Sequence, residues 1–91
     1  MNVEESVIKI LVLVNGLVLI SRIEEVGADI GEPDCKLTEP YVVNVEGLSP
    51  TLEPWLMSYT AQNSFMMSSD KILTLADPTN KLLETYENLL K

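Results

Sequence analysis

The sequence has no histidine, one cysteine and only six lysine and arginine residues among 91. Without histidine, it lacks the commonest general base, the commonest transition-metal ligand and the usual switch near neutral pH. The single Cys35 excludes an intramolecular disulfide and any zinc site built on several cysteines, and it fits a reducing compartment. We therefore predict a protein that is not an enzyme, with no catalytic residues, no metal site and no cofactor.

Positive charge is also scarce. Aspartate and glutamate number 14, so the formal net charge is −8. A surface of this sign repels phosphate backbones and anionic lipid headgroups, which disfavours nucleic acid and membrane partners. With 46% apolar residues the chain is nevertheless too hydrophobic for a disordered acidic tail. We predict one folded domain over residues 1–91, with apolar side chains to spare for contacts with other chains.

No hydrophobic run is long enough for a membrane helix. The most apolar segment, residues 7–20, is interrupted by Lys9 and by Asn15-Gly16, and a membrane helix needs about 20 continuous apolar residues. The first five residues are acidic rather than basic, which makes a poor secretory signal. We expect a cytoplasmic protein.

Short runs rich in β-branched residues predict five strands, at about 7–14, 17–26, 36–46, 55–67 and 71–76. Asn15-Gly16 predicts a hairpin with a type I′ turn. Segments 27–34 and 47–54, which contain glycine and proline, are predicted loops. Pro40 cannot donate a ladder hydrogen bond, so it predicts a bulge or an unpaired edge.

The spacing of apolar residues changes at Asp77-Pro78, from the alternation of a strand to the spacing of a helix. Aspartate is a favoured N-cap and proline a favoured first helical residue, so a helix is predicted over about 78–90. The fold class is thus mainly β, a five-stranded, strongly bent antiparallel barrel with a C-terminal α-helix. SH3-like, OB-like and Sm-like barrels all satisfy this pattern.

Several segments together resemble one family. These are Ile-Lys-Ile-Leu-Val-Leu-Val-Asn-Gly at 8–16, Glu-Pro-Tyr-Val-Val at 39–43, Leu-Glu-Pro-Trp-Leu at 52–56, Lys-Ile-Leu-Thr-Leu-Ala-Asp-Pro at 71–78 and Leu-Leu-Glu-Thr-Tyr at 82–86. They resemble short Sm-like proteins carried by tailed phages of marine cyanobacteria. The resemblance implies an Sm-like fold, a phage origin and the cytoplasm of the host cell.

The resemblance also implies assembly. In the wider Sm and Hfq families the fourth strand of one subunit pairs with the fifth strand of the next, closing a ring of about five to seven subunits. The residues carried over to this interface are Phe65, Met66, Met67, Ile72, Leu73 and Leu75. Ring closure would pair every exposed sheet edge. The alternative is that these side chains only fill the core of a single chain.

RNA binding is the family's other property, and the sequence departs from it. The loop at 27–34 is acidic and has no aromatic residue, and the loop at 67–71 offers only Lys71 as a cation. Base stacking needs flat side chains and phosphate contacts need cations. We therefore expect a non-enzymatic scaffold or adaptor that binds protein, with an RNA-binding ring that uses a non-standard site as the alternative.

The remaining candidates have simpler interpretations. An acidic cluster lacks the spacing of a calcium loop and is interpreted as a solvated face; its residues are Glu24, Glu25, Asp29, Glu32 and Asp34. Trp55 is expected to anchor the core or the ring interface, with ligand stacking as the alternative. Acidic neighbours of Cys35 disfavour its thiolate, which predicts an inert thiol.

Overall fold

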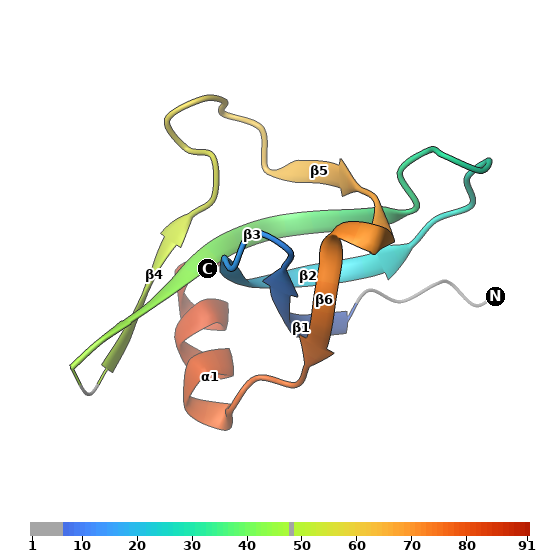
Figure 1. Cartoon of the computed structure of the whole chain (residues 1–91). Helices are drawn as coiled ribbons and strands as arrows, with labels where there is room; N and C mark the ends of the chain where they lie inside the picture. Colours follow the sequence, from blue (N-terminus) through green and yellow to red (C-terminus); the bar gives the residue numbers. More distant parts are fainter. Residues whose placement is uncertain (1–6, 48) are drawn as a thin grey trace, which may run out of the picture.

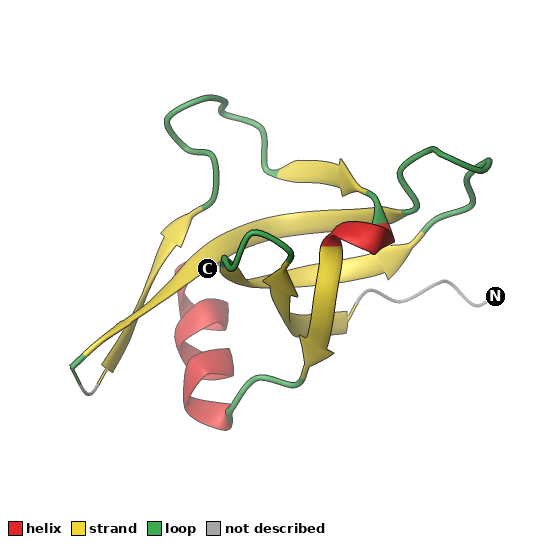
Figure 2. Cartoon of the chain, in the orientation of Figure 1, coloured by secondary structure: helices red, strands yellow, loops and turns green. Residues whose placement is uncertain are grey.

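The computed structural model describes residues 7–47 and 49–91 as one antiparallel sheet with an α-helix beside it (Figures 1 and 2). The elements are β1 (Val7–Leu13), β2 (Val18–Glu25), β3 (Cys35–Glu46), β4 (Ser49–Pro54), β5 (Ser64–Met67), the 3-10 turn η1 (Ser69–Lys71), β6 (Ile72–Ala76) and α1 (Asn80–Leu89). The strand order is β4-β3-β2-β1-β6, and β5 also pairs with β3. The fold is mainly β with a C-terminal helix, as predicted, but the sheet has six strands instead of five.

The β1–β2 hairpin is present, but its turn is not the predicted type. Residues 14–16 form a three-residue loop in which the Gly16 N–H donates to the Leu13 carbonyl at 2.8 Å and the Leu13 N–H donates to the Leu17 carbonyl at 2.9 Å. Within this loop only Gly16 has a positive φ, of 90°, whereas a type I′ turn needs two such residues. The loop is a type I turn closed by a glycine bulge, and it requires glycine at position 16.

The prediction was wrong over residues 47–67. The predicted loop at 47–54 contains β4, which pairs with β3, and of the predicted strand at 55–67 only β5 is a strand. Pro50 and Pro54 suggested a loop, but β4 is an edge strand, which tolerates proline because one of its sides has no ladder partner. After β4 the chain turns at Leu56, whose φ is 64° and whose carbonyl accepts N–H groups three and four residues later at 2.9 and 3.1 Å.

A bulge interrupts β3 at Pro40, as predicted. The register of the β2–β3 ladder shifts at this point, and Glu39 has a φ of 56°. Carbonyls freed from the ladder find side-chain donors: the Tyr86 hydroxyl donates to the Glu39 carbonyl at 2.8 Å, and the Ser21 hydroxyl donates to the Thr38 carbonyl at 3.1 Å. Buried carbonyls are almost always paired, so these hydroxyls are what makes the buried bulge stable.

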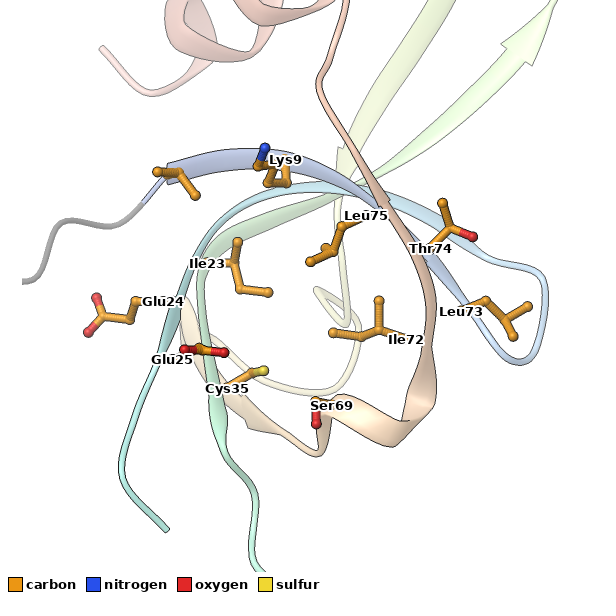
Figure 3. A pocket seen from close by; sticks show the side chains of 11 residues that line it. Lys9, Ile23, Glu24, Glu25, Cys35, Ser69, Ile72, Leu73, Thr74 and Leu75 are labelled. Atoms are coloured by element: carbon orange, nitrogen blue, oxygen red, sulfur yellow. The ribbon is translucent and has the colours of Figure 1, made fainter.

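The main core lies on the concave face, the face around which the sheet curls in Figure 3. It consists of the buried side chains of Leu11, Leu13, Leu19, Ile23, Cys35 and Leu37. Trp55 is half-buried and packs against this cluster, and its ring meets Phe65 edge-on with 5.8 Å between ring centroids. The structure therefore places Trp55 in the core of its own chain.

Helix α1 covers the opposite face, which we call the outer face. Tyr41 pairs with Ile20, whose neighbour Leu19 belongs to the concave core, so Tyr41 and Ile20 point outward from the sheet. Tyr86 of α1 meets Tyr41 edge-on with 5.8 Å between ring centroids. Tyr86 and Ile20 have no exposed surface. Both faces of the central hairpin are thus covered, as its apolar sequence requires.

The N-cap of α1 is Thr79, not the predicted Asp77. The Thr79 side-chain oxygen accepts the Leu82 N–H at 3.2 Å. The Asp77 carboxylate instead binds the ammonium group of Lys9 on β1 at 2.5 Å. Asp77 therefore links the segment before the helix to the sheet, and the helix begins at Asn80 instead of Pro78.

Candidate functional site

Strands β5 and β6 each have one edge without a ladder partner. β5 pairs with β3 and β6 pairs with β1, and among the described residues no pairing joins β5 to β6. An unpaired edge offers a row of N–H and C=O groups to another chain. The six residues predicted to meet across a subunit interface all lie on these two strands.

The side chains of β5 divide between the two faces. Phe65 pairs with Leu37 and Met67 with Cys35, so both point to the concave core and are half-buried. Met66 alternates with them, lies on the outer face and is 51% exposed. One large apolar side chain on the outer face of an edge strand is thus open to solvent.

The side chains of β6 divide in the same way, with one irregularity. Leu75 pairs with Leu11 and Ile72 with Leu13, so both belong to the concave face. The register shifts between them, which leaves Leu73 as an extra residue. Figure 3 shows Ile72 and Leu75 pointing into the hollow of the sheet and Leu73 pointing away from it. Leu73 is 65% exposed and Leu75 is 50% exposed.

A cavity of about 580 Å³ opens between β6 and the concave face. Its lining is Val7, Lys9, Ile23, Glu24, Glu25, Cys35, Ser69, Ile72, Leu73, Thr74 and Leu75 (Figure 3). The floor is apolar, and Glu25 pairs with Cys35 at its rim. The cavity has apolar walls on the β6 side, adjoining the free edge.

Cys35 lies on the wall of this cavity and is 5% exposed. Burial raises the pKa of its thiol, and the charges of Asp34 and Glu25 raise it further. A raised pKa disfavours the thiolate, which is the reactive form. This agrees with the prediction of an inert thiol.

The chain passes from β5 to β6 through residues 68–71, which we call the β5–β6 corner. The Asp34 carboxylate accepts the Ser69 N–H at 2.7 Å with one oxygen and the Ser69 hydroxyl at 2.8 Å with the other. The Val14 N–H donates to the Lys71 carbonyl at 2.9 Å. Hydrogen bonds from the Ser69 backbone and hydroxyl hold the pKa of Asp34 below its usual value. The corner is therefore held at both ends by the β2–β3 loop and the β1–β2 loop.

The sequence predicted neither Asp34 nor Ser69 for this role. Asp34 was predicted to lie on a solvated acidic face, and Ser69 lies in the loop at 67–71, for which no such contact was predicted. Within residues 7–47 and 49–91, no three histidine, cysteine or acidic side chains gather as a metal site would require. Lys71, the weak nucleic-acid candidate, is exposed, and no aromatic residue lies beside it in the corner. In the same part of the chain, no helix combines the length and apolar character of a membrane span.

Residues 6–91 match a family of unknown function, DUF6561. A search of curated proteins finds none that matches. Since the match extends over nearly the whole chain, the protein belongs to the family of unknown function DUF6561.

Proposed function

We propose that this chain is a non-enzymatic, Sm-like protein that assembles head to tail into a ring and acts as a scaffold or adaptor for another protein. The observation that carries the proposal is the pair of free strand edges, β5 and β6, each with exposed large apolar side chains. Apolar side chains on an open edge favour pairing with another chain.

The two edges match one another in length and in the placement of their side chains. β5 has four residues and β6 has five. If β5 of one copy continued the sheet beside β6 of the next, Met66 and Leu73 would both lie on the outer face. On the concave face, Phe65 and Met67 would lie beside Ile72 and Leu75. Every exposed apolar side chain of the two edges would then have an apolar neighbour.

Pairing of two different edges is a heterologous contact, so each copy keeps one free edge until the chain of copies closes on itself. Ring closure pairs the last free β5 and β6 edges, while the outer side of β4 stays open. The resemblance to Sm-like proteins implies about five to seven copies. In the ring, the curled sheet would complete the predicted Sm-like barrel, with one further strand, β4, beside β3.

Charge favours a protein partner over RNA. A ring of n copies carries a charge of −8n. Within the β5–β6 corner, residues 68–71, Lys71 is the one basic residue. A polyanion would be repelled at long range. A protein with a basic surface would be attracted.

Absolute mass by light scattering on a sizing column, at about 0.1 M and about 0.5 M salt, tests the assembly. We expect one oligomer of about five to seven subunits at both salt concentrations, because apolar edge contacts do not weaken with salt. A wild-type monomer would refute the ring. If the protein binds uridine-rich RNA tightly at low salt and Lys71→Ala abolishes this binding, the RNA-binding alternative replaces the scaffold proposal.

Two variants test whether the contact is head to tail. Met66→Asp damages the β5 edge and Leu73→Asp damages the β6 edge, so each protein alone should be monomeric. Mixed together, they still have one intact edge of each kind and should form a one-to-one dimer and nothing larger. Val45→Asp is the matched control, because Val45 is 70% exposed but lies on the β3–β4 hairpin; it should assemble normally. A symmetric contact between like edges would leave one variant assembled by itself.

A further inference from the structure

The β5–β6 corner joins the two proposed assembly edges within each copy. β5 is held to β3 and β6 is held to β1, and β3 and β1 lie on opposite sides of β2 in the strand order. The segment between them contains only η1 and the residue before it. Contacts of this short segment with the rest of the chain therefore act together with the two ladders on the orientation of the β5 edge relative to the β6 edge.

Two contacts fix the corner, and they differ in kind. At the end nearest β6, a backbone bond joins the Val14 N–H to the Lys71 carbonyl at 2.9 Å. At the end nearest β5, both oxygens of Asp34 bind Ser69, at 2.7 and 2.8 Å. Asp34 lies 35 residues away in the sequence, directly before β3, the strand that pairs with β5. The Asp34–Ser69 contact thus connects the corner to the strand that carries the β5 edge.

We infer that the Asp34–Ser69 contact fixes the angle between the β5 and β6 edges and so makes the assembly close at a single subunit number. The inference rests on the proposed head-to-tail ring. Asp34 is a positioning residue here, since it does not belong to either edge and acts through Ser69.

The physical reason is that errors in angle add up around a ring. In a ring of six, each copy turns the chain of subunits by about 60°, so a change of about 10° per copy changes the closing number by about one. A carboxylate held by two hydrogen bonds permits less rotation than one bond would. Without Asp34, the Ser69 N–H and hydroxyl lose the partner they have in the described structure, and only the Val14 bond holds the corner.

Native mass spectrometry of the full chain tests the inference. We expect one stoichiometry for the wild type and at least two neighbouring stoichiometries, or open chains, for Asp34→Ala. Asp34→Asn keeps one acceptor oxygen for the Ser69 N–H and should restore most of the single stoichiometry. Ser69→Ala, which keeps the N–H, should resemble Asp34→Asn, and the double variant Asp34→Ala with Ser69→Ala should be no more heterogeneous than Asp34→Ala alone.

The matched control is Asp29→Ala, a change of the same charge in the same loop, at a side chain with no hydrogen bond among the described residues. It should keep a single stoichiometry. If Asp29→Ala broadens the distribution as Asp34→Ala does, net charge sets the subunit number and the inference is wrong.

Hydrogen exchange, together with the subunit numbers, distinguishes failure of the Asp34–Ser69 inference from failure of the proposed ring. In Asp34→Ala the Ser69 amide should exchange about tenfold faster or more, while the β1–β2 amides stay protected. An assembled wild type with an identical Asp34→Ala distribution would overturn the inference and leave the ring standing. A monomeric wild type would overturn both. Unchanged exchange at Ser69 would overturn the corner contact whatever the state of assembly.

Discussion

Replacing Tyr86 with phenylalanine removes one oxygen atom from the most deeply buried contact between helix and sheet. Tyr86 has no exposed surface, and its hydroxyl donates to the Glu39 carbonyl at 2.8 Å and approaches the Thr38 carbonyl at 3.3 Å. Both carbonyls belong to the β3 bulge, where the ladder with β2 is interrupted. The ring of Tyr86, and therefore its packing against Tyr41, is retained in the variant.

The expected loss of unfolding free energy is about 1 to 2 kcal/mol. A typical hydrogen bond contributes about 1 kcal/mol net, and a buried acceptor left without a donor costs somewhat more, up to about 3 kcal/mol. The Thr38 carbonyl keeps the Ser21 hydroxyl as a neighbour at 3.1 Å, although the single proton of that hydroxyl has a nearer acceptor in the Arg22 carbonyl at 2.8 Å. Tyr86→Ala, which also empties the ring's volume, should cost about 3 to 5 kcal/mol.

Urea unfolding followed by circular dichroism measures this loss, at one fixed protein concentration because assembly would also stabilise the fold. The midpoint should fall by about 1 M for Tyr86→Phe with an unchanged slope. Tyr59→Phe is the matched control, since Tyr59 is 85% exposed; it should change stability by less than about 0.5 kcal/mol. Equal stability of Tyr86→Phe and wild type would refute the role given to the hydroxyl.

The same residue predicts an alkaline limit. Burial raises the pKa of Tyr86 from 10 to about 12. The unfolded chain then loses this proton before the folded chain does, so the contribution of Tyr86 is complete below pH 10 and is lost as the pH rises through about 12. Tyr86→Phe should remove this part of the alkaline loss, and a steep loss that persists in the variant would assign it to other groups.

Three further predictions concern the β1–β2 turn, the helix cap and the titration of Asp34. Gly16→Ala should cost about 1 kcal/mol or more because the φ of 90° is strained for alanine, whereas Gly27→Ala, at a position without positive φ, should cost less in the same urea assay. Thr79→Ala should cost about 1 kcal/mol of unfolding free energy, because Thr79 is the N-cap. Asp77→Ala removes an exposed ion pair and should cost less than about 0.5 kcal/mol. A larger loss for Asp77→Ala than for Thr79→Ala would show that Asp77 is the cap. Hydrogen bonds to Ser69 lower the pKa of Asp34, so the stability that Asp34 contributes is present above pH 3.8 and is lost as the pH falls through the lowered pKa. In Asp34→Asn the unfolding free energy should depend less on pH in this acid range. An unchanged dependence would contradict the prediction.

Local pattern was most informative where neighbours in sequence decide the structure. The β-branched runs and the Asn15-Gly16 turn predicted the β1–β2 hairpin, and the alternating residues after Cys35 predicted β3. Pro40 predicted the bulge because proline lacks a donor whatever the surroundings. The predicted turn type was wrong, because Asn15-Gly16 is equally compatible with a three-residue loop in which only the glycine has a positive φ.

Prediction of the secondary structure failed where residues distant in the sequence determine the local conformation. β4 contains two prolines, and it is a strand only because the protruding half of β3 supplies a ladder on one side. Residues 55–63 alternate like a strand, but no strand lies beside them, and the chain turns at Leu56 instead. Asp77 has the chemistry of an N-cap, but Lys9, 68 residues away, occupies its carboxylate.

The sequence by itself therefore determined the mainly β class, four of the six strands, the C-terminal helix, the acidic charge and the absence of histidine chemistry. These follow from backbone sterics, side-chain periodicity and counts of charge, all of which act locally or by simple addition. Only the tertiary structure decided which strand edges stay unpaired, that Tyr86 supports the β3 bulge, and that Asp34 holds the β5–β6 corner. Each of these depends on atoms that are distant in the sequence and meet only after the sheet has paired; the separation is 35 residues for Asp34 and Ser69 and 47 for Glu39 and Tyr86. Local sequence patterns contain no information about such distant partners.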